Sequence, residues 1–371
     1  MLTYCTNIHP GESWAQVQRG IAENVPQIRD ALSAPGNFPI GVWLSGRAQR
    51  DIAADGSREF QEWMTANRCE VQSINGFPYG DFHAGRVKEN VYLPDWRDTE
   101  RSDYSAGLAR ILASWLPEGK TGVISTVPLA FQKLRRENDL NAIRKNLGAT
   151  LEVIDAIAQA TGKQILLALE AEPACMLETT PEVLRFFAQL KLPASLAQHL
   201  GICFDCCHHA VEFESPARSL REIQDAGIRV AQAHVTCALR VPGGELERLA
   251  RFSEPVYLHQ TVGRRTDGSL VRFDDLPQAL AAKIDGWDFD EWRVHFHVPV
   301  FQSQLGDCTT TQPELQEMLG VLPRETPLVV ETYTFGVLPP ELQARTMPES
   351  IARELKWVQA QLALQIQAPR S

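Results

Sequence analysis

Short apolar runs rich in β-branched residues alternate along this chain with longer stretches that carry apolar residues at helical spacing. Such alternation of strands and helices predicts a parallel α/β sheet, and eight repeats predict closure of that sheet into a (β/α)8 TIM barrel. The expected strands are 2–8, 38–45, 69–76, 121–127, 164–170, 200–205, 229–235, 293–300 and 327–333.

These nine candidate strands compete for eight places in the barrel. A long stretch, 241–290, separates the seventh candidate from the last two. We therefore expect residues 293–300 to form an extra strand within an insertion of about 241–300, although a register in which this strand belongs to the barrel stays open. No repeat, low-complexity tract or linker interrupts the pattern, which predicts one domain over residues 1–371 with elaborated loops.

Three stretches have the clearest helical pattern. Residues 11–32 begin with a Gly-Glu-Ser cap and contain Pro26, which predicts a break or bend. Residues 178–190 have a proline, Pro181, in the first turn, where the missing N–H costs nothing. Residues 137–161 place a row of apolar side chains on one helix face: Leu140, Ile143, Leu147, Leu151, Ile154 and Ile157.

Charge and composition limit the partners that we expect. The net charge is −10 and no large basic cluster is present, which argues against a nucleic-acid or anionic-membrane partner. No apolar run approaches the ~20 residues of a membrane span, and the first residues lack the charged and apolar regions of a signal peptide. We expect a cytoplasmic protein, and a homo-oligomer stays open.

The eight cysteines fit a reducing compartment better than a disulfide framework. Cys5, Cys203 and Cys237 lie in apolar runs and are expected to be small buried side chains. Cys206 and Cys207 are adjacent and lack the spacing of a zinc–thiolate site, which disfavours that interpretation.

Four of the expected strands end in residue types that bind divalent metals. The runs QILLALE, LGICFD, VAQAH and PLVVE end at Glu170, Asp205, His234 and Glu331. The carboxyl ends of barrel strands meet at one mouth of the barrel, where active sites are built. Three carboxylates and one imidazole suit Mn²⁺, Mg²⁺, Co²⁺ or Zn²⁺, so we expect one divalent metal ion at this mouth.

Other histidines are candidates for substrate binding at the same mouth. His208 follows Asp205 by three residues, and the spacing favours it over the adjacent His209. His295 and His297 share one face of their expected strand, so a metal pair, substrate binding and a buried structural role all stay open. His9 and Asn7 lie at the end of the first strand and are further candidates at this mouth. The loop 75–96 follows the third strand, is dense in aromatic residues and is expected to bind substrate or act as a lid, with His83 and Arg86 as its polar contacts.

The ordered endings LLALE, CFDCCH, QAHVTCALRVPG and LVVE resemble those of the xylose isomerase-like TIM barrels, and of the ketose 3-epimerases among them. The resemblance implies that Glu170, Asp205, His234 and Glu331 bind one metal and that the two glutamates also transfer the substrate proton. It further implies that His208 and Arg240 contact the substrate. The 3-epimerases carry another Glu where this chain has Met176, which puts epimerisation of a free ketose in doubt.

Three further stretches, TYCTNIHPGESW, NGFPYGDFHAGRVKENVYLPDW and VHFHVPVF, look like those of the EboE metabolite traffic proteins. The expected activity is a metal-dependent isomerase or epimerase that acts on a sugar, cyclitol or related polyol by enediolate-type proton transfer. One alternative is a non-catalytic metabolite-binding or traffic protein. The other is a metal-dependent phosphodiesterase of the endonuclease IV type, which would need more histidine and carboxylate ligands.

Overall fold

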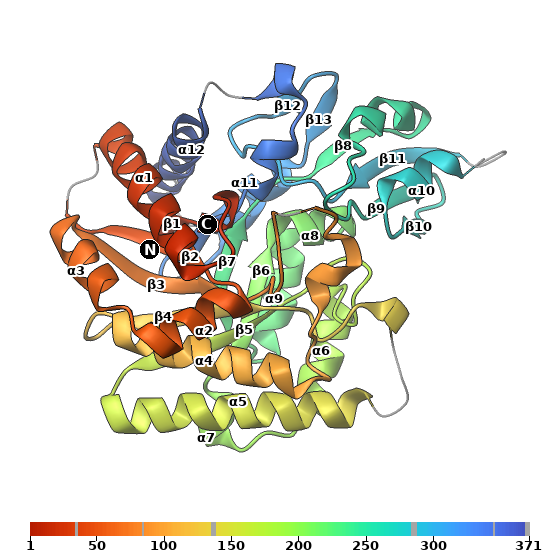
Figure 1. Cartoon of the computed structure of the whole chain (residues 1–371). Coiled ribbons are helices and arrows are strands. Elements are labelled where there is room, and N and C mark those ends of the chain that lie inside the picture. The colour runs from red at the N-terminus through yellow and green to blue at the C-terminus, as the bar shows by residue number, and fades with distance from the viewer. Residues whose placement is uncertain (34–35, 84, 135–138, 283–287, 344–345, 368–371) are drawn as a thin grey trace.

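The centre of the protein is a sheet of eight parallel strands that curves into a barrel (Figure 1). The computed structural model describes residues 1–33, 36–83, 85–134, 139–282, 288–343 and 346–367. The bridge between Cys5 and Gly41 joins the two edge strands of the sheet, so the barrel closes. In their order around the barrel the strands are β1 Leu2–Tyr4, β14 Leu328–Val330, β7 Val230–Val235, β6 Leu200–Asp205, β5 Gln164–Glu170, β4 Thr121–Thr126, β3 Cys69–Asn75 and β2 Phe38–Trp43.

Helices cover the outside of this barrel (Figure 1). No described helix combines the length and the apolar character needed to cross a membrane. The helices are α1 Trp14–Leu32, α2 Gly46–Asp55, α3 Arg58–Ala66, α4 Thr99–Trp115, α5 Asp139–Thr161, α6 Thr180–Gln189, α7 Ala194–Ala197, α8 Cys206–Val211, α9 Pro216–Asp225, α10 Leu276–Ala281, α11 Gln312–Val321 and α12 Met347–Gln367.

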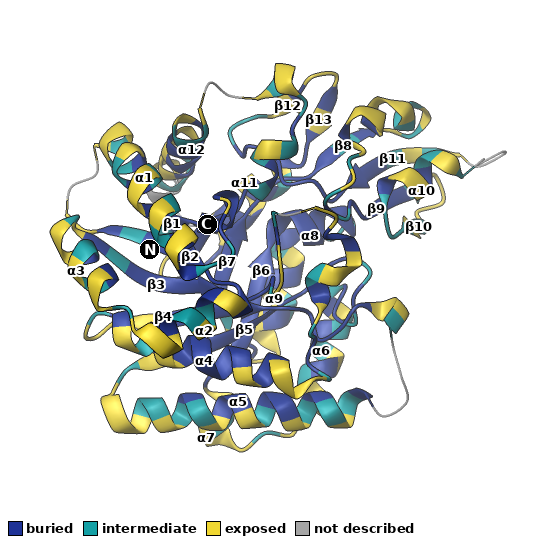
Figure 2. Ribbon diagram, in the orientation of Figure 1, coloured by how far each residue is buried: buried dark blue, intermediate teal, exposed yellow. Residues whose placement is uncertain are grey.

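The predicted fold class is confirmed, and the strands owe their apolar runs to burial on both faces. The barrel strands are dark blue in Figure 2, whereas the outer faces of the helices are largely exposed. A parallel strand that packs between helices and the barrel interior needs apolar side chains in both directions.

Helix α1 continues through Pro26, so the expected break is absent. The first two residues of the predicted helix 137–161 lie outside the described residues, and α5 is helical from Asp139 to Thr161.

A second sheet lies between β7 and β14 in the sequence. It is antiparallel, with the order β10 Leu270–Phe273, β9 Thr261–Arg265, β11 Phe289–Val294, β8 Leu239–Pro242, β13 Cys308–Thr310 and β12 Gln304–Leu305. The expected strand 293–300 is therefore wrong in its extent, because β11 ends at Val294. From His295 onward the backbone hydrogen bonds no longer form a regular ladder. His295 N donates to Gln260 O (2.8 Å) and Val298 N donates to Cys237 O (3.1 Å). Pro299 has no N–H that could continue a ladder.

A buried carboxylate, Glu354, connects α12 to the end of β14. Its Oε2 accepts hydrogen bonds from Thr332 Oγ1 (2.7 Å) and from Val300 N (3.1 Å), while its Oε1 has no partner among the described residues. Burial raises the pKa of Glu354 from 4.5 to about 7, against the lowering effect of these hydrogen bonds. The folded protein therefore holds a proton that the unfolded chain releases above pH 4.5, and stability falls as the pH rises towards 7.

Glu354→Gln is expected to stabilise the protein at pH 8 by about 3 kcal/mol and to change little at pH 4.5. The amide oxygen can keep both hydrogen bonds while the NH2 group takes the place of the unpartnered oxygen. Urea unfolding at the two pH values measures the difference. Glu349→Gln, an exposed change on the same helix, is the control; equal pH dependence in both variants would contradict the burial of charge at Glu354.

Candidate metal centre and its cavity

Four ionisable side chains at the carboxyl ends of neighbouring strands converge inside the barrel mouth. Glu170 ends β5, Asp205 ends β6, His234 lies near the end of β7, and Glu331 follows β14. The sheet register sets Asp205 beside His234 and His234 beside Val329. One ligand atom from each of the four lies within 4.8 Å of the others, and all four residues are buried. We call these four residues the carboxylate–histidine set.

Hydrogen bonds fix the orientation of this set. His234 Nδ1 lies 2.9 Å from Glu170 Oε1 and 3.0 Å from Glu331 Oε2. Glu331 Oε1 also accepts hydrogen bonds from the amides of Asn7 (2.9 Å) and Asn75 (2.6 Å). Asn75 ends β3, so the strand-end rule that selected Glu170 could have found it from the sequence, although we did not predict it as a site residue.

The two glutamates have pKa values shifted in opposite directions. Burial raises the pKa of Glu170 to about 8, because the nearby His234 compensates only in part. Burial acts on Glu331 in the same sense, but the charge and hydrogen bond of His234 outweigh it and lower the pKa of Glu331. Without a metal ion, the structure thus favours a protonated Glu170 and an ionised Glu331 in the same cavity.

Two oxygens of the set are suited to bind a cation. Among the described residues, Glu170 Oε2 and Asp205 Oδ2 are buried without a hydrogen-bond partner. Buried carboxylate oxygens without a partner are costly unless a cation neutralises them. Ligands of one ion, each ~2.1 Å from it, lie at most about 4.2 Å apart. The observed limit of 4.8 Å requires shifts of only a few tenths of an ångström, so these residues fit a divalent metal ion.

A cavity opens beside the set. Its empty volume, including the part open to solvent, is about 510 Å³. Its walls are formed by residues at the carboxyl ends of the barrel strands and by aromatic residues of the 75–96 segment. Residue 84 of this segment lies outside the described residues. The lining residues are Asn7, Asn75, Phe77, Pro78, Phe82, Val87, Lys88, Val91, Tyr92, Glu170, Glu172, His208, Tyr257, Leu258, His295, His297, Glu331 and Tyr333.

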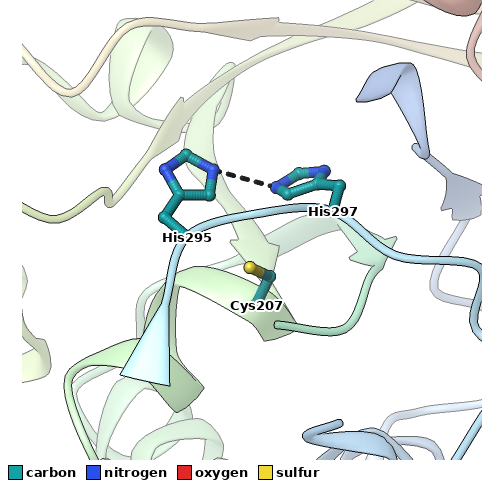
Figure 3. Close-up of side chains that lie close together, drawn as sticks. All are labelled: Cys207, His295 and His297. Carbon is teal, nitrogen blue, oxygen red and sulfur yellow. Dashed lines mark hydrogen bonds between the residues drawn. The ribbon is translucent and has the colours of Figure 1, made fainter. Parts of the chain in front are cut away.

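Three of the expected substrate-binding histidines line this cavity, whereas His209 does not. His208, His295 and His297, which we call the histidine cluster, are buried beside one another. His208 Nε2 lies 3.1 Å from His295 Nε2, which in turn lies 3.0 Å from His297 Nε2. Burial lowers the pKa of His208 to about 4 and that of His295 well below its usual value. Figure 3 shows His295 and His297 facing each other near the thiol of Cys207.

The structure does not bring the other expected substrate contacts to the cavity wall. Arg240 lies within β8, where Nε bonds Thr309 Oγ1 (3.3 Å) and Nη1 lies 3.6 Å from Glu314, so the prediction that it lines this cavity is corrected. The paired strands β11 and β13 on either side of β8 hold it there.

The other three expected substrate contacts, Arg86, His9 and His83, also do not line the cavity. Arg86 is exposed. His9 bonds the Tyr4 hydroxyl (3.0 Å), and burial lowers its pKa to about 3. His83 lies just behind the cavity wall, where Nε2 donates to Asn7 O (2.7 Å).

Glu172, which we had not assigned to the site, lines the cavity, and Gln260 lies behind it. Glu172 Oε1 accepts hydrogen bonds from Tyr92 (2.8 Å) and from Gln260 Nε2 (3.2 Å). Gln260 belongs to the insertion, so no strand-end pattern in the sequence pointed to it. Glu172 follows Glu170 by two residues, which was the only available signal.

Lys88 ties the 75–96 segment to the insertion. Its Nζ donates to the backbone oxygens of Glu254 (3.1 Å) and Tyr257 (2.6 Å) and pairs with Asp275 Oδ2 (2.7 Å). The Lys88 side chain is only 7% exposed.

Lys88→Met is expected to destabilise the protein by about 2 kcal/mol, because it leaves the largely buried Asp275 carboxylate without its charged partner. It should also increase proteolytic cleavage within 75–96. Chemical unfolding and limited proteolysis measure the two effects. Arg86→Met, a change of the exposed cation two residues earlier, serves as the matched control. If both variants behave like the unmodified protein, Lys88 does not tie the segment down.

Comparisons with known proteins agree with this architecture. No family model matches the chain, and no curated protein matches it in sequence. Among solved structures, a xylose isomerase-like TIM barrel protein from Mycobacterium smegmatis, solved with magnesium, aligns over 98% of this chain and 97% of its own, with a TM-score of 0.54 and 10% identity. The chain has the xylose isomerase-like TIM barrel fold.

The IOLI protein, solved with a bound zinc atom, aligns over 99% of both chains, with a TM-score of 0.51 and 11% identity. At these identities the likeness concerns the fold of this xylose isomerase-like barrel. The argument for its site rests on the geometry of its own residues.

Proposed function

We propose that this xylose isomerase-like barrel is a metal-dependent isomerase or epimerase of a sugar, cyclitol or related polyol. The observation that carries the proposal is the convergence of Glu170, Asp205, His234 and Glu331 at the carboxyl ends of four strands, beside a cavity that Glu170 and Glu331 line. The resemblance of short stretches to the EboE metabolite traffic proteins supports a substrate from a small-molecule biosynthetic route.

The two glutamates would divide the proton transfer. Glu331, with its lowered pKa, is ionised and can remove a proton next to a substrate carbonyl. Glu170, the other glutamate of the set, would be the group that returns a proton to the substrate. Return of the proton to another carbon isomerises the substrate, and return to the opposite face of the same carbon epimerises it. The Asn7 and Asn75 amides hold the Glu331 carboxylate in position.

Glu170, Asp205, His234 and Glu331 would hold the divalent ion, which polarises a carbonyl and stabilises negative charge on oxygen. Magnesium and zinc, as bound by the two barrels above, are both candidates. Aromatic walls from the 75–96 segment exclude water, and polar groups such as Lys88 and Glu172 face the cavity.

The test is solvent deuterium incorporation. The metal-loaded protein is incubated in D2O with a panel of ketoses, inososes and related polyols, and mass spectrometry measures deuterium at carbon. Metal-dependent incorporation into one substrate class is expected. Tight binding of a co-purified metabolite with no incorporation and no turnover would instead support a carrier.

A second candidate function is a metal-dependent phosphodiesterase. The specific observation in its favour is the histidine cluster, because multi-metal hydrolysis needs ligands beyond one set. The net charge of −10 disfavours long nucleic acids as substrates. Hydrolysis of bis(4-nitrophenyl) phosphate by the metal-loaded protein, without deuterium incorporation into any polyol, would favour this function.

A further inference from the structure

A chain of polar side chains crosses the interior of the barrel below the carboxylate–histidine set. Strands β3 and β7 are four places apart in the eight-stranded order, so they face each other across the barrel. The Ser73 hydroxyl of β3 donates to Gln232 Oε1 of β7 (2.9 Å), and Gln232 Nε2 lies 3.0 Å from His234 Nε2. Gln232 Nε2 also donates to Cys203 Sγ (3.5 Å). Gln232 therefore joins the opposite side of the barrel to the imidazole of the set.

The barrel itself has no need of a glutamine at this position. The interior of such barrels is normally filled with branched apolar side chains, and Leu166, Ala168 and Cys203 of β5 and β6 belong to one apolar cluster. Gln232 is 0% exposed, and a buried amide is costly unless its polar atoms are hydrogen-bonded. The contact with His234 gives this amide a role that an apolar side chain could not fill.

The two ring nitrogens of His234 face different groups. Nδ1 lies 2.9 Å from Glu170 Oε1, 3.0 Å from Glu331 Oε2 and 3.6 Å from Asp205 Oδ2, so a cation held by these carboxylates would take Nδ1 as its ligand. Nε2 faces Gln232 instead. A neutral imidazole that binds a cation through one nitrogen carries its proton on the other. His234 Nε2 then has to donate a hydrogen bond, and Gln232 is its partner.

The Gln232 amide can receive this hydrogen bond by turning over. A half-turn about its last side-chain bond exchanges the oxygen and the NH2 group. Oε1 then accepts from His234 Nε2–H, while the NH2 group donates to Ser73 Oγ, because a hydroxyl accepts as well as donates. The contacts of Gln232 with Ser73 and His234 are thus kept in either orientation of the amide.

We propose that Gln232 is a positioning residue for the divalent ion: it accepts a hydrogen bond from His234 Nε2–H and so holds Nδ1 towards the ion. Ser73 supports the amide from the opposite strand. Residues two apart share one face of a strand, so the run VAQAH of β7 places the support directly behind the ligand. The inference rests on the proposed ion of the carboxylate–histidine set, and it adds a residue that touches neither ion nor substrate.

Zinc affinity tests the inference without any substrate. Chelator-treated protein is titrated with Zn²⁺ in competition with a chromogenic chelator. Gln232→Met keeps the length of the side chain but removes the acceptor, and it should weaken Zn²⁺ binding by about 10- to 100-fold. Gln232→Glu restores an acceptor for His234 Nε2–H and supplies another for the Ser73 hydroxyl, so its affinity should match or exceed that of the unmodified protein. The control is Gln312→Met, a change of another buried glutamine that donates to Val300 O, and it should bind Zn²⁺ normally.

The outcomes separate positioning from packing and from the proposed function. Normal Zn²⁺ affinity in Gln232→Met, or a loss in Gln232→Glu as large as that in Gln232→Met, would overturn the role of Gln232 and leave the proposed metal ion intact. Absence of Zn²⁺ binding in the unmodified protein would overturn both. Urea unfolding of the metal-free variants shows whether each one folds. If Gln232→Met does not, Gln232→Glu decides: affinity at least equal to that of the unmodified protein supports the role, and weaker binding rejects it.

Discussion

Glu331→Gln is expected to reduce deuterium incorporation into the substrate by a factor of about 10³, because the variant lacks the group that we propose removes the proton. The change also removes one negative charge from the carboxylate–histidine set, so metal affinity should fall in parallel. The rate is measured at saturating metal, which separates the loss of the proton acceptor from the loss of metal.

Glu354→Gln is the matched control for this experiment. Glu354 is a buried carboxylate close to the end of β14, but it does not line the cavity. This variant should keep the full rate. A Glu331→Gln variant that exchanges deuterium at the normal rate when loaded with metal would exclude Glu331 as the base and leave it only a ligand role.

Removal of metal by a chelator is expected to make the stability of the protein strongly dependent on pH. Burial raises the pKa of Glu170 from 4.5 to about 8 when no metal ion is present. The folded state then holds a proton that the unfolded chain releases, so stability should fall between about pH 5 and pH 8, by about 1.4 kcal/mol per pH unit from this group. The raised pKa of His234 acts in the same direction above pH 6.5.

Two comparisons check this second prediction. Addition of Zn²⁺ or Mn²⁺ at pH 8 should restore the stability, because the ion binds only the folded state. Metal-free Glu170→Gln should have a flatter pH profile than the metal-free unmodified protein, since the titrating group is gone. Thermal unfolding at a series of pH values measures both, and a metal-free protein whose stability is constant from pH 5 to pH 8 would contradict the prediction.

The barrel could be predicted from the sequence because strands that are buried on both faces appear as short continuous apolar runs. In the run QILLALE every residue between Gln164 and Glu170 is apolar, as expected for a buried parallel strand whose last residue lies at the mouth of a barrel. The insertion was harder to predict. The alternation in VHFHVPV is typical of a strand, yet β11 ends at Val294 and the two histidines leave its ladder to reach the cavity.

The candidate site could be predicted where side-chain direction follows from the strand itself. Glu170 and Asp205 lie at strand ends, so barrel geometry alone brings them together. Arg240 was expected at the cavity from a motif resemblance, but its direction depends on β8 and its neighbours in the antiparallel sheet. Gln260 is brought in by tertiary packing of the insertion, and nothing in its local sequence signals that contact.

All eight cysteine thiols are buried and free, and they are distributed from the first barrel strand to β13. A thiol-reactive dye can therefore modify the native protein only when a local or global opening exposes one of them. Mass spectrometry of the order in which Cys5, Cys207 and Cys308 become labelled would follow local opening after β1, at α8 and at β13 separately. The eight cysteines of the chain can therefore report where the structure opens without an added probe.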